Sequence, residues 1–195
     1  MIKSIIFDFD GVIHDTFEIG FRLNKIVNPD ITEGEYRDFF NGNLYEHKKG
    51  ITPVRIEKFF ELQEKEFEAL MIEEEIKQEL LKLKKKYKLF IVTSNKEGTL
   101  KKYFERSNLS NLFDEILGIE THTSKEEKFK LMFERNKLNK EECIFITDTL
   151  GDLLEAQRFG IKTIAVDYGF HDVERLKKGN PIKIISHIKE IEGLL

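Results

Sequence analysis

The sequence predicts an α/β fold: a three-layer core around a parallel sheet, with a small all-helical segment inserted after the first strand. Short apolar runs rich in β-branched and aromatic residues alternate with amphipathic helical stretches, which is typical of a parallel sheet covered by helices on both faces. One interval, from about Thr16 to Tyr87, has only helical pattern and is far longer than one crossover helix requires; its last helix leads back into the sheet. We therefore expect a core of residues 1–15 and 79–195 and a helical cap of residues 16–78.

Six apolar runs are the expected strands. They lack strict alternation, as strands buried on both faces do, and they lie at residues 4–9, 88–93, 115–119, 143–147, 163–167 and 182–185. Helices are expected at residues 17–27, 34–40, 54–71 and 73–87. A capping pattern from Thr32 to Glu35 and the Thr52-Pro53 pair mark two of the helix starts.

Composition and charge narrow the functions that the chain can have. The 195 residues suffice for a sizeable core, and a net charge of −4 argues against a nucleic-acid partner, which needs a basic surface. No apolar run approaches the ~20 residues of a membrane helix, and residues 1–11 do not form a signal peptide, so a cytoplasmic protein without a membrane partner is expected. The single cysteine, Cys143, excludes an internal disulfide and is expected in the core. The oligomeric state cannot be derived from the sequence.

Two aspartates follow the first predicted strand in the sequence FDFDG. Side chains alternate along an extended strand, so Asp8 and Asp10 are expected to point to the same side. They lie at the carboxyl end of the strand, where open α/β sheets bind their ligands, and Gly11 lets the backbone turn away. Two carboxylates this close repel each other unless a cation or a proton intervenes, which favours a metal site or a nucleophile paired with an acid.

A hydroxyl and a helix start follow the second predicted strand. Thr93 ends that strand, and Ser94 to Glu97 has the form of a capping box that would open the next helix. A helix N-terminus with free N–H groups attracts phosphate, so Thr93, Ser94 and Asn95 are candidate phosphate-binding residues. By itself this signal is weak, because serine and threonine cap helices in most proteins.

A second acidic pair follows the fourth predicted strand. Asp148 ends the strand and is expected to face Asp8, which would complete an oxygen-rich site for a hard cation such as Mg²⁺. Asp152 comes four residues later and is better placed to hold a metal-bound water or a lysine. That lysine is Lys125 or Lys128; Lys125 is preferred because it is expected just before a helix rather than in its first turns.

These residues resemble the four motifs of the haloacid dehalogenase superfamily of phosphohydrolases. FDFDG is similar to the first motif, Thr93 to the second, Lys125 to the third and TDTLGD to the fourth. The C-terminal segment resembles the phosphoglycolate phosphatase-like branch, and the helical insertion resembles its type 1 cap. The chain departs from the branch in having glutamate after Lys125, where proline is usual, and Thr147 where glycine is commoner.

The resemblance implies a Rossmann-like core and a Mg²⁺-dependent phosphatase that acts on a small phosphorylated metabolite. Asp8 would be the nucleophile that forms an aspartyl-phosphate, and Asp10 the general acid and base. Mg²⁺ would be bound by the Asp8 carboxylate, the Asp10 backbone carbonyl and Asp148. Thr93 and Lys125 would hold the phosphoryl oxygens.

Three alternatives stay open at this point. A phosphomutase uses the same four groups but returns the phosphoryl group to its substrate. A phospho-accepting module, like a receiver domain, also combines acidic residues, a hydroxyl and a lysine at one sheet edge. A catalytically silent binding module is the third. A dehalogenase fits poorly, because that branch lacks the second aspartate and Asp10 is present.

Overall fold

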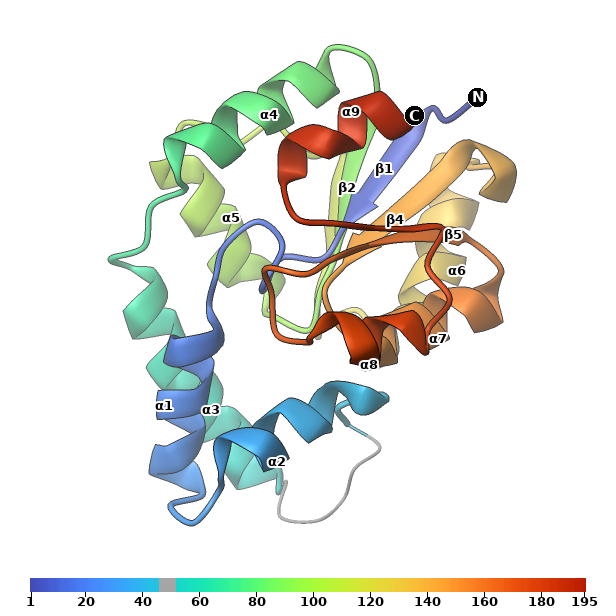
Figure 1. Ribbon diagram of the computed structural model, residues 1–195. Coiled ribbons are helices and arrows are strands. Elements are labelled where there is room, and N and C mark those ends of the chain that lie inside the picture. The colour runs from blue at the N-terminus through green and yellow to red at the C-terminus, as the bar shows by residue number, and fades with distance from the viewer. Residues whose placement is uncertain (46–51) are drawn as a thin grey trace.

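A computed structural model, which describes residues 1–45 and 52–195, confirms the α/β fold (Figure 1). Six parallel strands form one sheet in the order β3-β2-β1-β4-β5-β6. Their bounds are β1 Ser4–Phe7, β2 Lys88–Val92, β3 Glu115–Leu117, β4 Cys143–Thr147, β5 Lys162–Val166 and β6 Lys183–Ile185. Each observed strand overlaps an expected run and differs from it by at most two residues at either end.

The central strand β1 pairs with both β2 and β4. Phe7, the last residue of β1, is in register with Ile91 on one side and Ile146 on the other. The three central strands therefore end at the same sheet edge. The strand order reverses between β1 and β4, and ligands of open α/β sheets bind outside the strand ends at such a switch point.

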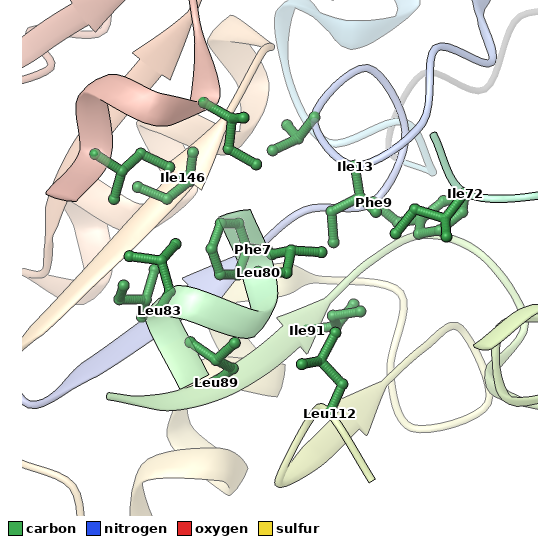
Figure 2. Close-up of a cluster of buried hydrophobic side chains, with 14 of the residues drawn as sticks. Phe7, Phe9, Ile13, Ile72, Leu80, Leu83, Leu89, Ile91, Leu112 and Ile146 are labelled. Carbon is green, nitrogen blue, oxygen red and sulfur yellow. The ribbon is translucent and has the colours of Figure 1, made fainter. Parts of the chain in front are cut away.

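Helices cover both faces of the sheet because alternate strand residues point to opposite faces. On one face Phe7 and Ile91 pack with Leu80 and Leu83 of α4 (Glu74–Lys84) and with residues of α5 (Glu97–Arg106) (Figure 2). On the other face lie α6 (Lys125–Asn136) and α7 (Leu150–Phe159). The shorter elements α8 (Val173–Lys177), α9 (Ile191–Leu194), η2 (Lys140–Glu142) and η3 (Ile188–Glu190) complete the core. Cys143 is buried at the start of β4, as predicted.

The insertion after β1 contains α1 (Phe17–Val27), α2 (Glu33–Asp38), η1 (Phe39–Asn41) and α3 (Pro53–Phe67). These helices lie together beyond the carboxyl-terminal edge of the sheet (Figure 1). Phe17 and Tyr36 form a small core with Phe170, which the chain supplies from beyond β5. The insertion is thus anchored on the part of the core that borders the strand ends.

Two helix starts agree with the sequence and a third does not. Thr32 and Glu35 form the expected capping box, and Thr52 caps α3 with Pro53 at its first turn. Helix α5 begins at Glu97, with Lys96 at the N-cap, so the capping box predicted at Ser94 is wrong. The Glu97 carboxylate instead accepts hydrogen bonds from the Gly118 N–H and the Thr121 hydroxyl, which holds it against the neighbouring loop.

The boundary of the insertion stays a prediction. Helix α4 is continuous from Glu74 to Lys84 and buries Leu80 and Leu83 against the sheet, so a boundary at residue 78 falls within a core helix. The break between α3 and α4, at residues 68–73, is the more natural end of the insertion. Among the described helices, none is long and apolar enough to cross a membrane.

Candidate active site

Three aspartates meet where β1 and β4 end. Asp8 directly follows β1, and its N–H donates to the Ile146 carbonyl of β4 at 2.9 Å, which continues the strand pairing. Asp148 directly follows β4, and Asp152 lies in the first turn of α7. One carboxylate oxygen from each of Asp8, Asp148 and Asp152 lies within 4.8 Å of the other two. The structure thus brings Asp8 and Asp148 together and adds Asp152 directly to the group.

Lys125 neutralises part of this charge. Its Nζ lies 2.6 Å from Asp8 Oδ2 and 2.6 Å from Asp152 Oδ2, with the lysine side chain only 3% exposed. It is the first residue of α6 rather than a residue before it, and Ser124 caps the helix. Burial by itself would lower the pKa of Lys125, but the charges of Asp152 and Asp8 outweigh burial and raise it. Lys125 therefore stays an ammonium beside Asp8.

Lys128 occupies a different place. It is completely buried one turn further along α6, and its Nζ donates to the backbone carbonyl of Thr93. Burial, together with the nearby positive charge of Lys125, lowers the pKa of Lys128 to about 8. The two lysines that the sequence could not separate thus have distinct positions: Lys125 faces the carboxylates, and Lys128 lies behind the end of β2.

Asp10 is held by two donors. The Thr16 hydroxyl donates to Oδ1 at 2.6 Å, and the Asn95 side-chain N–H donates to Oδ2 at 2.7 Å. Burial raises the pKa of Asp10 to about 6, even though both hydrogen bonds oppose that rise. Thr16 was missed by the sequence analysis, since nothing in its local pattern separates it from any other residue at the start of a helix.

Of the three residues that follow β2, two line the cavity and one does not. Ser94 and Asn95 line the same cavity as Asp8 and Asp10. Thr93 is completely buried, its hydroxyl accepts from the Asn95 N–H at 3.2 Å, and it is not among the described residues that line the cavity. The Thr93 side chain therefore shapes the turn that presents Asn95 to Asp10.

Asp148 fits the role of a metal ligand. Its Oδ2 accepts from the Phe170 N–H at 2.7 Å, whereas Oδ1 is buried and has no hydrogen-bond partner in the part of the chain that the structure describes. Burial raises the pKa of Asp148 to about 8. A Cβ added to Gly11, whose φ is +67°, would lie 1.9 Å from Asp148 Oδ2, so glycine is required there. An orphaned carboxylate oxygen beside two further carboxylates suits a hard cation such as Mg²⁺.

Asp152 bridges the lysine and the strand. Its Oδ2 accepts from Lys125 and from the Thr147 hydroxyl, which lies 2.7 Å away. Burial would raise the pKa of Asp152, but the Lys125 ammonium and these hydrogen bonds outweigh burial and lower it. For Asp8, burial dominates, and with the neighbouring carboxylates it raises the pKa well above the ordinary value despite Lys125. A divalent cation would relieve that repulsion.

The insertion closes over these groups and leaves a cavity. The cavity holds about 1150 Å³ of empty space, including the part continuous with solvent. Asp8, Asp10 and Lys125 line it from the core, and residues of α1, η1 and α3 line it from the insertion. The Tyr45 hydroxyl donates to the Ser94 carbonyl at 3.3 Å, which ties the insertion to the loop after β2.

A buried glutamate joins the insertion to the core. Glu155 of α7 accepts hydrogen bonds from the Asn43 side chain at 3.2 Å, the Ser124 hydroxyl at 2.7 Å and the Lys125 N–H at 3.0 Å. It thereby fixes the start of α6, and with it Lys125, against the loop of residues 40–43. The sequence analysis missed Glu155 and Asn43, because their pairing spans 112 positions.

Comparison with known proteins places this geometry in a family. The model of the haloacid dehalogenase-like hydrolases matches residues 5–166. PpaX of Caldanaerobacter subterraneus subsp. tengcongensis, assigned as a pyrophosphatase, is 25% identical over 92% of this chain and 88% of its own length. A phosphoglycolate phosphatase of Synechococcus elongatus is 21% identical over 92% of this chain and 91% of its own. The crystal structure of a predicted phosphatase from Clostridium acetobutylicum superposes with a TM-score of 0.81, at 22% identity, over 100% of this chain and 98% of that one.

Proposed function

The chain belongs to the haloacid dehalogenase-like hydrolase family and is a phosphatase, and we propose that it hydrolyses a small phosphomonoester metabolite through an aspartyl-phosphate on Asp8 with the help of Mg²⁺. One observation carries the proposal: the Asp8–Asp10 pair, Lys125 and Asp148 come from three separate segments of the chain and line one cavity beside the strand ends. Asp8 and Asp152 both contact the Lys125 ammonium and both belong to the possible ligand set for a cation. Asp8 is the candidate nucleophile because it directly follows β1 in the FDFDG motif beside Asp10, whereas Asp152 Oδ2 also accepts a hydrogen bond from the Thr147 hydroxyl.

The first step transfers the phosphoryl group to Asp8. An Asp8 carboxylate oxygen forms a bond to phosphorus as the bond to the ester oxygen breaks, and protonated Asp10 gives its proton to the departing alcohol oxygen. Burial favours the protonated form of Asp10, and Thr16 and Asn95 keep its carboxyl group oriented. Lys125 offsets charge on the phosphoryl oxygens.

The second step releases phosphate. Asp10, now a carboxylate, accepts a proton from water as the water oxygen bonds to phosphorus and the bond to Asp8 breaks, which restores both aspartates. Asp8, Asp148 and the Asp10 backbone carbonyl would hold Mg²⁺, as expected from the sequence, and the structure adds Asp152, whose carboxylate lies beside those of Asp8 and Asp148. Ser94 and Asn95 line the cavity, where they could contact phosphoryl oxygens. When bound, Mg²⁺ supplies positive charge that offsets the carboxylates and the phosphoryl oxygens.

The test is phosphate release from a panel of phosphomonoesters that includes an aryl phosphate. We expect multiple turnovers with Mg²⁺, loss of activity in EDTA and recovery when Mg²⁺ is added in excess. A phospho-accepting module would release about one equivalent at most and then stop. A phosphomutase would convert a sugar phosphate into its isomer without net phosphate release. Either result would overturn the proposal.

A further inference from the structure

We infer that the substrate is a phosphomonoester whose alcohol carries a flat, largely apolar ring with a hydrogen-bonding edge. This inference rests on the proposed phosphatase function and specifies its substrate class. It comes from the part of the cavity that the insertion forms, which the chemical step does not use. The aromatic lining, the polar group and the charge of the cavity each favour this class of phosphomonoester.

The insertion presents aromatic rings to the cavity. Seven of the described ones line it: Tyr45 from the segment after η1 and, from α2, η1 and α3, Tyr36, Phe39, Phe40, Phe59, Phe60 and Phe67. Phe59 is half-buried and packs edge-on against Phe60, with ring centroids 5.8 Å apart. Rings arranged in this way favour a flat apolar group, because they offer faces and edges for stacking.

A buried amide lies among these rings. Gln63 is only 6% exposed and lines the cavity, and its amide atoms are not enclosed without a partner in the way that Asp148 Oδ1 is, so the amide is open to the cavity. On α3 it lies four residues after Phe59 and four before Phe67, so the three side chains share one face of the helix. An amide at the wall of a cavity can pair with a ligand edge that has one donor and one acceptor, which would replace its hydrogen bonds to water.

The charge of the cavity disfavours an acidic leaving group. Asp8, Asp10, Asp148 and Asp152 all line it. Among the described lining residues the basic ones are Lys125, which is paired with Asp8 and Asp152, and Arg55, which already takes part in an interaction within the protein. A carboxylate on the leaving alcohol, as in phosphoglycolate, would thus add negative charge where the basic groups are engaged. A two-carbon acid would also leave most of the space between the rings unfilled.

Two sources supply the inferred chemistry: nucleoside monophosphates and phosphorylated heteroaromatic alcohols. Uridine 5′-monophosphate and pyridoxine 5′-phosphate represent them, and phosphoglycolate and glycerol 3-phosphate are the ring-free comparisons. We expect kcat/KM for at least one ring-bearing ester to exceed that of both ring-free esters by about tenfold or more. The ester with the higher kcat/KM, uridine 5′-monophosphate or pyridoxine 5′-phosphate, shows which of the two groups supplies the substrate. Ring-free esters that react as well as both ring-bearing ones would overturn the inference.

Two variants test the residues. Gln63→Leu should lower kcat/KM about tenfold for the preferred ester and leave phenyl phosphate, whose ring has no hydrogen-bonding edge, unchanged. Phe59→Ala should lower kcat/KM for the preferred ester and for phenyl phosphate alike. Gln157→Leu and Glu57→Ala, at exposed positions outside the cavity, are the matched controls. A Gln63→Leu effect that is equal for all esters would contradict the assigned role.

Binding separates this inference from the proposed reaction. Calorimetry on the Asp8→Asn protein with Mg²⁺ measures the affinity of the same four esters without turnover. Tighter binding of a ring-bearing ester, weakened by Gln63→Leu, supports the inference even if no ester is hydrolysed by the wild type, in which case the proposed function alone fails. Equal or weaker binding of the ring-bearing esters overturns the inference even where phosphate release is observed.

Discussion

The two sides of the cavity are built in different ways. On the core side, charged groups follow directly after strands or begin helices, and each carboxylate is fixed by named hydrogen bonds or ion pairs, as for Asp10 and Asp152. On the insertion side, rings on helices pack mainly against one another, as Tyr36 does with Phe40 at 5.3 Å. Under the proposed function, this difference means that the core would carry out the reaction and the insertion would select the substrate.

The core side and the insertion side of the cavity should also respond differently to substitutions. Hydrogen bonds and ion pairs in a buried site depend on precise geometry, so a substitution there should affect the rate of the chemical step. Rings in a partly open cavity can adjust, so a substitution there should affect affinity and selectivity more than the maximal rate. The following predictions test this division, from the largest expected effect to the smallest.

The largest effect is expected for Asp8→Asn. The amide retains the volume of the side chain but cannot act as the nucleophile, so kcat should fall by at least about 10³-fold. Steady-state phosphate release with the preferred ester measures it, and circular dichroism checks that the variant is folded. Turnover within a few fold of the wild type would show that the core side does not act through Asp8.

A smaller difference is expected between the two buried lysines. Lys125→Ala removes the ammonium that contacts Asp8 and should lower kcat by about 10²-fold or more. Lys128→Met retains most of the volume and removes only a contact to the Thr93 carbonyl, so kcat should fall less than about tenfold. Both variants are compared at saturating substrate and Mg²⁺. Equal losses, or a greater loss for Lys128→Met, would reverse the assignment of the phosphate-binding lysine.

A still smaller effect is expected for a substitution at the contact between the core and the insertion. A Cβ on Gly151 of α7 would lie 2.3 Å from the Gly42 carbonyl oxygen and 2.8 Å from that of Phe40, so Gly151→Ala must displace the loop of the insertion. We expect a loss of about 1–3 kcal/mol in the free energy of unfolding and a KM raised severalfold, with kcat changed less. Gly34→Ala, in α2 with open space around the position, is the control. If both variants behave alike, the contact does not position the insertion.

The smallest effect concerns pH and stability. The pKa of Lys128 is lowered to about 8 in the folded chain, below its ordinary value of 10.5. Between these values the unfolded chain binds more protons than the folded one, so this residue makes the free energy of unfolding rise with pH, by up to about 1.4 kcal/mol per pH unit. Denaturant unfolding of wild type and Lys128→Met from about pH 7 to about pH 9.5 measures it. The free energy of unfolding of the wild type should increase relative to that of the variant as the pH rises. If the difference between the two free energies of unfolding does not change with pH, the pKa of Lys128 is not lowered.

Much of the core side could be predicted from the sequence. Apolar runs locate the strands, and parallel strands end at a shared edge, so Asp8 and Asp148 were expected at the same edge of the sheet. The pairing of β1 with β4 then brings them close together. Local patterns failed where a tertiary contact competes with them. At Ser94 the helix starts later than its capping pattern indicates, because Glu97 bonds to Gly118 rather than to the helix start.

The sequence by itself determined the sheet, the insertion and which residues follow the strand ends, because hydrophobic periodicity and strand direction are local properties of the chain. Only the tertiary structure decided that Lys125 rather than Lys128 faces Asp8, that Thr16 and Asn95 hold Asp10, and that Gln63 lies buried among rings. These arrangements depend on how separate helices pack against one another. Packing joins residues that no short window of sequence contains together, so no local pattern records it.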